Sequence, residues 1–429
     1  MKTEKTIQST SQSTDLQHAI AAHINEPEKL ENLYRSQKAA FESSFNRVYP
    51  TIQSNLSAQI WNQRLNHPST VLSSVSRTDV VLVFVAALVS GMIANFNKII
   101  GVEPDVFLQR NIGFVVFPML IVFFGIKQRL QLRQLLLPVV SVVVSVVYIN
   151  LFPQSSNNDA VLLAALHLPI FLWSMLGFTF VRGNLGDASR KLDFLRFNGD
   201  FTVMTAIIFL SGVLFTAITI GLFGIIGLDI EQLYTEHILA WGLAAVPILS
   251  TYLVYTNPQL VNNISPTIAR IFTPIVFVTL LVFLIAMVYT GKNLYQDRDF
   301  LIIFNLLLIA VMAIILFSVT EATKGRIQLL QHYMLFGLSL LTILLNGLAL
   351  SAIGFRLAEY GVTPNRIAVL GANLLIFVHL IMVTRELYRM VGGESTGEQI
   401  GRAITLFMPA YAVWTALVTF VFPLLFGYK

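Results

Sequence analysis

The chain has 429 residues, of which 55% are hydrophobic and only 12% are charged, and its mean hydropathy is +0.71. A water-soluble domain cannot cover so apolar a composition with a polar surface, so lipid must solvate most of the chain. Cysteine is absent, which excludes disulfides, a thiolate nucleophile and a Cys-ligated metal. The net charge is +5, but the cations lie in connectors between apolar runs. This pattern favours lipid headgroups over nucleic acid as their partners.

The amino-terminal residues precede the apolar runs. Residues 1–25 are rich in Gln, Ser and Thr, predict a disordered polar tail and hold no signal-peptide core. From residue 26 onward, apolar residues such as Leu30, Leu33 and Tyr34 recur every three to four positions. This period predicts a cytoplasmic amphipathic helical module over residues 26–77. The module packs on the membrane surface or on the protein's own loops, or residues 1–77 form the docking surface of a protein partner.

Residues 78–429 predict an all-α polytopic transmembrane helix bundle. A hydrocarbon core about 30 Å thick needs about 20 apolar residues per helix, and runs of this length follow one another to the end of the chain. We expect about eleven spans, at residues 79–95, 111–126, 135–152, 159–181, 201–227, 239–256, 267–290, 299–319, 329–355, 367–383 and 403–427.

Lys and Arg are distributed unevenly between the connectors. With eleven spans, 21 of the 28 basic residues lie on the side of the amino terminus and seven lie on the other side. The positive-inside rule then predicts a cytoplasmic amino terminus and an external carboxyl terminus. An even number of spans would place the carboxyl terminus in the cytoplasm. An error in the number of spans would arise at the Phe422-Pro423 kink in the last predicted span.

Acidic residues are missing from the middle of every predicted span. Those near the spans lie at helix starts, namely Asp79, Asp159, Asp200 and Asp299. A carboxylate at this position caps free backbone amides, so the chain lacks the buried carboxylate that proton-coupled carriers commonly use. The acidic connector at residues 229–237 has no metal-ligand spacing, so we assign no metal. No soluble-enzyme or cofactor motif is present, and we predict no cofactor.

Several neutral polar side chains lie inside the predicted spans, namely His167, Asn305, Asn346, Asn373 and His379. Such a group is costly in hydrocarbon unless a partner helix satisfies it, so each should face the bundle interior. Hydrogen bonding between helices is favoured over substrate contact as their role. Asn373 and His379 cannot share one face, because six residues turn a helix by about 240°.

Prolines interrupt several predicted spans, and each one frees a backbone carbonyl and bends its helix. Broken helices line substrate sites in many transporters, although proline also occurs in spans with no transport role. The most site-like example is His167-Leu-Pro169, with Trp173 one turn further along. We therefore predict a cavity to which His167, Trp173, Asn373 and His379 are the candidate contributors.

One segment resembles a known family. The residues Arg356-Leu-Ala-Glu-Tyr-Gly-Val-Thr-Pro-Asn-Arg366, followed by an apolar helix, resemble the hallmark of bacterial multi-helix membrane proteins catalogued as domain of unknown function 4153. The residues 224–230 and 28–34 are similar to that family as well. The resemblance implies a multi-pass protein of the bacterial inner membrane, and it supplies no activity, cofactor or catalytic residue.

The same segment is a candidate site on physical grounds. Arg356, Glu359 and Arg366 lie at a short turn between two apolar helices, on the side where the positive-inside rule gives no reason for arginines. An ion pair of Glu359 with one of the arginines would stabilise the turn. The functional alternative is that the arginines bind an anionic headgroup or solute.

Two classes of function follow from these patterns. The first is a transporter or a lipid- or solute-handling membrane protein whose site lies among the proline-containing helices, with membrane lipids as partners. The second is a non-transporting assembly or signalling protein that uses residues 1–77 as a partner surface. An enzyme is not indicated, because the sequence contains no catalytic motif.

Overall fold

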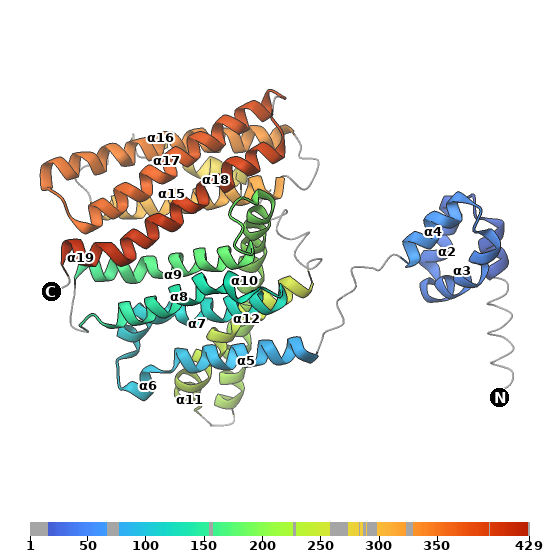
Figure 1. Cartoon of the computed structure of the whole chain (residues 1–429), viewed down its shortest axis with the longest axis horizontal. Coiled ribbons are helices and arrows are strands. Elements are labelled where there is room, and N and C mark those ends of the chain that lie inside the picture. The colour runs from blue at the N-terminus through green and yellow to red at the C-terminus, as the bar shows by residue number, and fades with distance from the viewer. Residues whose placement is uncertain are drawn as a thin grey trace. The chain divides into compact units, whose positions relative to one another are not determined.

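The computed structural model describes residues 16–66, 77–153, 158–225, 229–257, 273–282, 284–285, 289, 298–322, 329–393 and 395–427. Across these ranges all regular structure is helical, which confirms the predicted all-α class. The chain divides into two compact units, Met1–Val75 and Ser76–Lys429, which Figure 1 draws. The division falls close to the boundary that the sequence predicts after residue 77.

The amino-terminal unit contains a short helix over residues 16–22 and the longer helices α2 (Pro27–Ser36), α3 (Lys38–Ile52) and α4 (Leu56–Asn66). Their apolar faces meet in an aromatic core, in which the ring of Phe41 lies 5.3 Å from that of Trp61. Arg64 of α4 donates a 2.7 Å hydrogen bond to Glu31 of α2. This bond and a second from Arg35 lower the pKa of the Glu31 carboxyl to about 2.

The helical unit begins earlier than its periodicity predicts. Residues 16–22 are helical, and Ile20 and Ile24 are buried in the aromatic core. The sequence predicts a disordered polar tail up to residue 25, and this prediction is wrong for residues 16–25. The reason is that Leu16, Ile20 and Ile24 recur every four residues, a narrow apolar stripe hidden among polar neighbours. Residues 1–15 lie outside the described residues.

The second unit is a helix bundle. Its described helices, including the π-helical turns η1 and η2, are α5 (Arg77–Ala94), α6 (Asn97–Ile100), α7 (Pro104–Lys127), α8 (Leu132–Asn150), α9 (Asp159–Phe180), α10 (Ala188–Ile225), α11 (Glu231–Leu233), η1 (Tyr234–Leu239), α12 (Ala240–Thr256), an unlabelled helix (Thr273–Val282), α15 (Arg298–Ala322), α16 (Leu329–Tyr360), α17 (Pro364–Val391), α18 (Gly397–Ala416), η2 (Leu417–Val421) and α19 (Phe422–Phe426). Among the described residues, eight stretches are long and apolar enough to cross a membrane. They fit a multi-pass membrane protein.

Helix α10 differs most from its predicted span. It begins at Ala188, whereas hydropathy predicts a start at residue 201. Leu192, Phe194 and Phe197 are buried among the charged residues that precede the apolar run, so the helix extends well beyond that run. Residues that the sequence assigns to a connector therefore lie on a packed helix.

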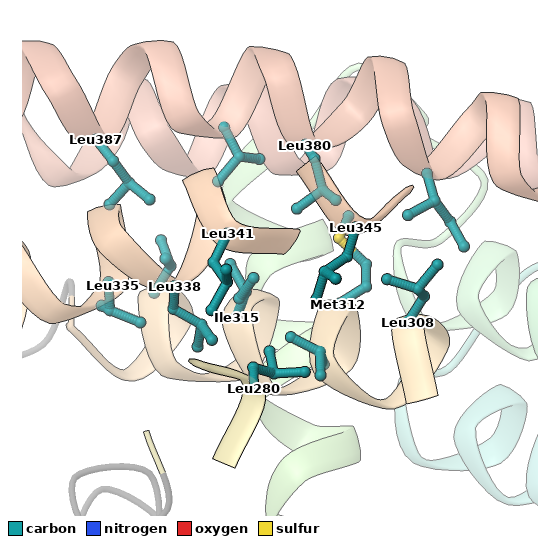
Figure 2. Packing of buried hydrophobic residues seen from close by; sticks show 14 of the residues in the cluster. Leu280, Leu308, Met312, Ile315, Leu335, Leu338, Leu341, Leu345, Leu380 and Leu387 are labelled. Carbon is teal, nitrogen blue, oxygen red and sulfur yellow. The ribbon is translucent and has the colours of Figure 1, made fainter. Parts of the chain in front are cut away.

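Two apolar clusters account for most of the described core of the bundle. The first joins α5, α7, α9, α10 and α12, and at its centre the ring of Phe124 lies 5.1 Å from the rings of Phe180 and Phe197. The second joins the unlabelled helix at residues 273–282 to α15, α16, α17 and α18. Figure 2 shows leucines of this second core, such as Leu280, Leu345 and Leu380, pointing toward one another. Smaller clusters connect the two, since Leu163 of α9 packs with Ala368 of α17 and Phe422 of α19.

Polar contacts between helix ends show which helix ends lie at the same end of the bundle. Lys127 pairs with Asp79, and Gln134 donates a 2.9 Å hydrogen bond to the carbonyl of Arg182, which brings together the start of α5, the end of α7, the start of α8 and the end of α9. At the other end of α9, Asn158 donates a 2.9 Å hydrogen bond to the carbonyl of Gly427. The carboxyl-terminal helix therefore ends opposite the start of α5, as Figure 1 also shows.

Small residues allow close helix contacts in the bundle. A Cβ atom added to Gly91 of α5 would lie 2.1 Å from Cε3 of Trp241 on α12, so only glycine fits at this crossing. The indole ring has no flexible end that could move aside. Ala87 and Gly91 lie four residues apart on α5, and small residues at this spacing allow helices to approach closely.

Gly91→Ala should lower the free energy of unfolding by about 1–3 kcal/mol, because the new methyl group overlaps the Trp241 ring. Gly212→Ala is the matched control, since a Cβ atom there meets nothing within 4 Å in the interior of α10. Thermal unfolding of both purified variants in detergent checks the prediction. Equal midpoints for the two variants would contradict the close approach of α5 and α12.

Candidate functional site

A pocket of 310 Å³ lies between α7, α9, α10 and α12. Its wall is mainly apolar and aromatic, and the residues that matter for its shape and chemistry are Gly113, Pro169, Trp173, Asn198, Thr205 and Pro247. Ligand pockets in proteins typically combine such an apolar wall with a few polar groups. The pocket contains Trp173 and Pro169, the pair around which the sequence predicts a cavity.

Prolines and a glycine shape this pocket. Pro169 lies inside α9 and Pro247 inside α12, and each proline removes one amide donor from the hydrogen-bond ladder of its helix. A Cβ atom added to Gly113 of α7 would lie 3.0 Å from Cδ1 of Leu172 on α9. The glycine therefore lets α7 and α9 approach closely beside the pocket.

The polar groups of the pocket belong to three residues. The Trp173 indole donates a 2.7 Å hydrogen bond to the Asn198 side-chain oxygen, and the Asn198 amide donates a 2.6 Å hydrogen bond to the carbonyl of Phe194. The Thr205 hydroxyl oxygen is buried and has no hydrogen-bond partner in the described part of the chain. An unpaired hydroxyl in an apolar wall costs free energy unless a bound molecule supplies a partner.

His167 does not join Trp173 in this pocket. Its ring Nδ1 donates a 2.9 Å hydrogen bond to the carbonyl of Leu163, one turn back on α9, and its side chain is absent from the pocket wall. His167 and Trp173 are six residues apart, which turns a helix by about 240° and separates their side chains. The structure therefore places Trp173 at this pocket and His167 on another face of α9.

Asn373 and His379 lie on α17, outside the pocket. The Asn373 amide donates a 2.8 Å hydrogen bond to the side-chain oxygen of Asn305 on α15. His379 Nδ1 lies 3.0 Å from the hydroxyl of Tyr411 on α18. Both side chains form the interhelical hydrogen bonds that the sequence predicts for them, and neither contacts the Trp173 pocket.

The turn after α16 is stabilised differently from the ion pair that the sequence suggests. Glu359 is exposed and forms no ion pair with any described residue. Instead, Arg366 donates 2.6 Å hydrogen bonds to the carbonyls of Tyr360 and Gly361. These oxygens belong to the carboxyl end of α16, where the helix dipole favours a cation. Arg366 reaches the backbone carbonyls of the turn, whereas the Glu359 side chain is exposed.

Gly361, Thr363 and Tyr360 also shape the turn between α16 and α17. Gly361 adopts φ +77°, and the Thr363 hydroxyl accepts a hydrogen bond from the Arg366 amide and caps α17. The guanidinium groups of Arg356 and Arg366 lie 5.9 and 5.6 Å from the centroid of the Tyr360 ring. Both distances are within the range of a cation–π contact.

Sequence reasoning missed Asn198 and Thr205. Asn198 falls in residues that hydropathy assigns to a connector, and Thr205 is one of many threonines in apolar runs. The signal available for Asn198 was its position between Phe197 and Phe201, at helical spacing in an aromatic stripe. Nothing in the sequence distinguishes Thr205, because its missing partner is a property of the packed helices.

Comparison with known proteins finds no matching family model, no matching curated protein and no matching solved structure.

Arg366→Gln should lower the stability of the protein in detergent by about 1 kcal/mol, because it removes a charged donor from two carbonyls. Glu359→Gln should leave the midpoint of thermal unfolding unchanged, since this carboxylate is exposed and unpaired in the described residues. Measuring both variants side by side tests the arrangement. A larger loss for Glu359→Gln than for Arg366→Gln would restore the ion-pair interpretation.

Proposed function

We propose that this chain is an integral membrane protein that binds a lipid, or a similarly apolar solute, in the Trp173 pocket, as a transporter or lipid-handling protein does. The observation that carries the proposal is the buried Thr205 hydroxyl, which has no hydrogen-bond partner among the described residues and lies at a mainly apolar wall. A carbonyl or hydroxyl of the ligand would pair with Thr205, while its apolar part would fill the space beside Trp173.

The position of the pocket supports this proposal. It lies between helices that contain Pro169 and Pro247, and proline-bent helices can move relative to their neighbours with little loss of hydrogen bonding. A pocket between such helices can open and close toward the surrounding lipid. The volume of 310 Å³ is near the lower limit, about 300 Å³, of typical ligand pockets.

The pocket can be tested by filling it. Thr205→Phe places a ring in the pocket, whereas Thr202→Phe adds the same bulk to an exposed position of α10. We expect Thr205→Phe to reduce labelling by a photoreactive fatty acid in purified protein by about tenfold, and Thr202→Phe to leave it unchanged. Mass spectrometry should map the wild-type label to the wall of the pocket. Equal labelling of both variants would overturn the proposal.

We also propose eleven spans in a bacterial inner membrane, in line with the resemblance to the family of domain of unknown function 4153. Three helices complement the eight membrane-length stretches: α12, the unlabelled helix at residues 273–282 and α15. Helix α12 packs against α5 and α10 within the bundle, and α15 has 25 residues. The excess of basic residues on one side favours a cytoplasmic amino terminus.

Reporter fusions test this topology. A reporter fused after Gly186 should behave as cytoplasmic, and one fused after Lys429 should be active only if it functions outside the cytoplasm. The reason is the odd number of spans between the start of α5 and the carboxyl terminus. Fusions that report the same compartment at both positions would contradict the proposed count.

A second candidate function is a non-transporting assembly or signalling protein. The observation that favours it is an exposed apolar pair on α4, where Leu56 is 70% and Ile60 is 60% exposed. The two side chains are four residues apart and share one face of the helix, as expected for a docking surface. Under this alternative, filling the Trp173 pocket would leave the activity of the protein unchanged.

A further inference from the structure

A second pocket, of 1160 Å³, differs in character from the Trp173 pocket. It lies between the start of α10, the end of α17 and the start of α18, at the end of the bundle where α5 begins. Four basic side chains line it, namely Lys191, Arg196, Arg389 and Arg402. The acidic residues in its wall are Asp187, Glu386 and Glu398. Its charge and volume indicate a polar ligand rather than an acyl chain.

The arginines of this polar pocket already have carboxylate partners. Arg389 lies 3.3 Å from Glu386, and Arg402 lies 2.6 Å from Glu398. Arg196 lies 3.0 Å from Asp193, outside the pocket wall. These pairs keep the arginines in place, and a guanidinium bound to one carboxylate still has donors free for a second anion.

Lys191 differs from the arginines because it is only 7% exposed and forms no ion pair with any described residue. Its ammonium group donates a 3.0 Å hydrogen bond to the carbonyl of Thr405 on α18. Asp187, one turn earlier, instead caps α10 and pairs with Arg190 at 3.2 Å. An ammonium group has three donors, so Lys191 keeps two that the described residues do not use.

A buried cation without an ion-pair partner among the described residues is costly, and an anion in the pocket would offset that cost. Two helices also direct their amino termini at the same space, since Ala188 and Ser189 of α10 and Gly397 of α18 line the pocket. The amino terminus of a helix carries a partial positive charge, which adds to the field of the basic side chains.

We propose that this polar pocket binds a phosphate-bearing anion, with Lys191 as the central contact and Arg402 as a contact at its rim. A phosphate group offers several acceptor oxygens and can contact an ammonium and a guanidinium group together. The phosphate belongs either to the headgroup of an acidic phospholipid or to a soluble compound. The site is independent of the Trp173 pocket, which has a different wall.

The test uses the full-length protein in a detergent without phosphate groups. Titrations with short-chain phosphatidic acid and with inorganic phosphate are compared with short-chain phosphatidylcholine. We expect at least one of the first two probes to bind, and Lys191→Gln to weaken that binding about tenfold. Binding of phosphatidic acid alone assigns the site to a headgroup, and binding of inorganic phosphate as well assigns it to a soluble anion.

Two further variants keep the test decisive. Arg402→Gln removes an exposed rim cation, whose loss leaves folding intact, and should weaken binding several-fold. Arg133→Gln removes an exposed cation of α8 at the same end of the bundle, outside the pocket, and should have no effect. Absence of binding by both phosphate probes, or equal affinities for wild type and all variants, would overturn the proposal. Thr205→Phe should leave phosphate binding unchanged. The test of the polar pocket is therefore independent of the test of ligand binding in the Trp173 pocket.

Discussion

In the hydrocarbon core of a membrane no water is available to pair with backbone or side-chain polar groups, and each one must find its partner within the chain. Helices meet this requirement for the backbone, and contacts such as Asn373 with Asn305 and His379 with Tyr411 pair some of the buried side chains. Other buried polar atoms, among them Asn373 Oδ1 and His379 Nε2, have no partner among the described residues. An unpaired group points to a ligand only where it also lies beside a pocket.

Two such groups define the two proposed sites. Among the described residues, the Thr205 hydroxyl has no hydrogen-bond partner beside an apolar pocket, and the Lys191 ammonium group has no ion-pair partner in a polar one. Both residues belong to α10, on successive parts of one long helix. Burial of an unpaired group lowers stability, so a fold that keeps such a group beside an open pocket is poised to bind a complementary molecule.

Much of this arrangement could be predicted from the sequence, and the rest depends on contacts between helices. Hydropathy predicts the all-α class because lipid requires about 20 apolar residues per span, and Pro169 and Trp173, which the sequence singles out, line the apolar pocket. The start of α10 was missed because its charged residues resemble a connector. The pairing of Arg366 with carbonyls instead of Glu359 depends on side-chain directions that spacing does not specify.

The most direct test of the account is an experimental structure of the full-length protein in lipid nanodiscs. It should show density for a bound molecule between α7, α9, α10 and α12, with a polar atom within hydrogen-bond distance of the Thr205 hydroxyl. A structure in which α7 and α9 close the pocket, and the Thr205 hydroxyl donates to a carbonyl of its own helix, would contradict the account.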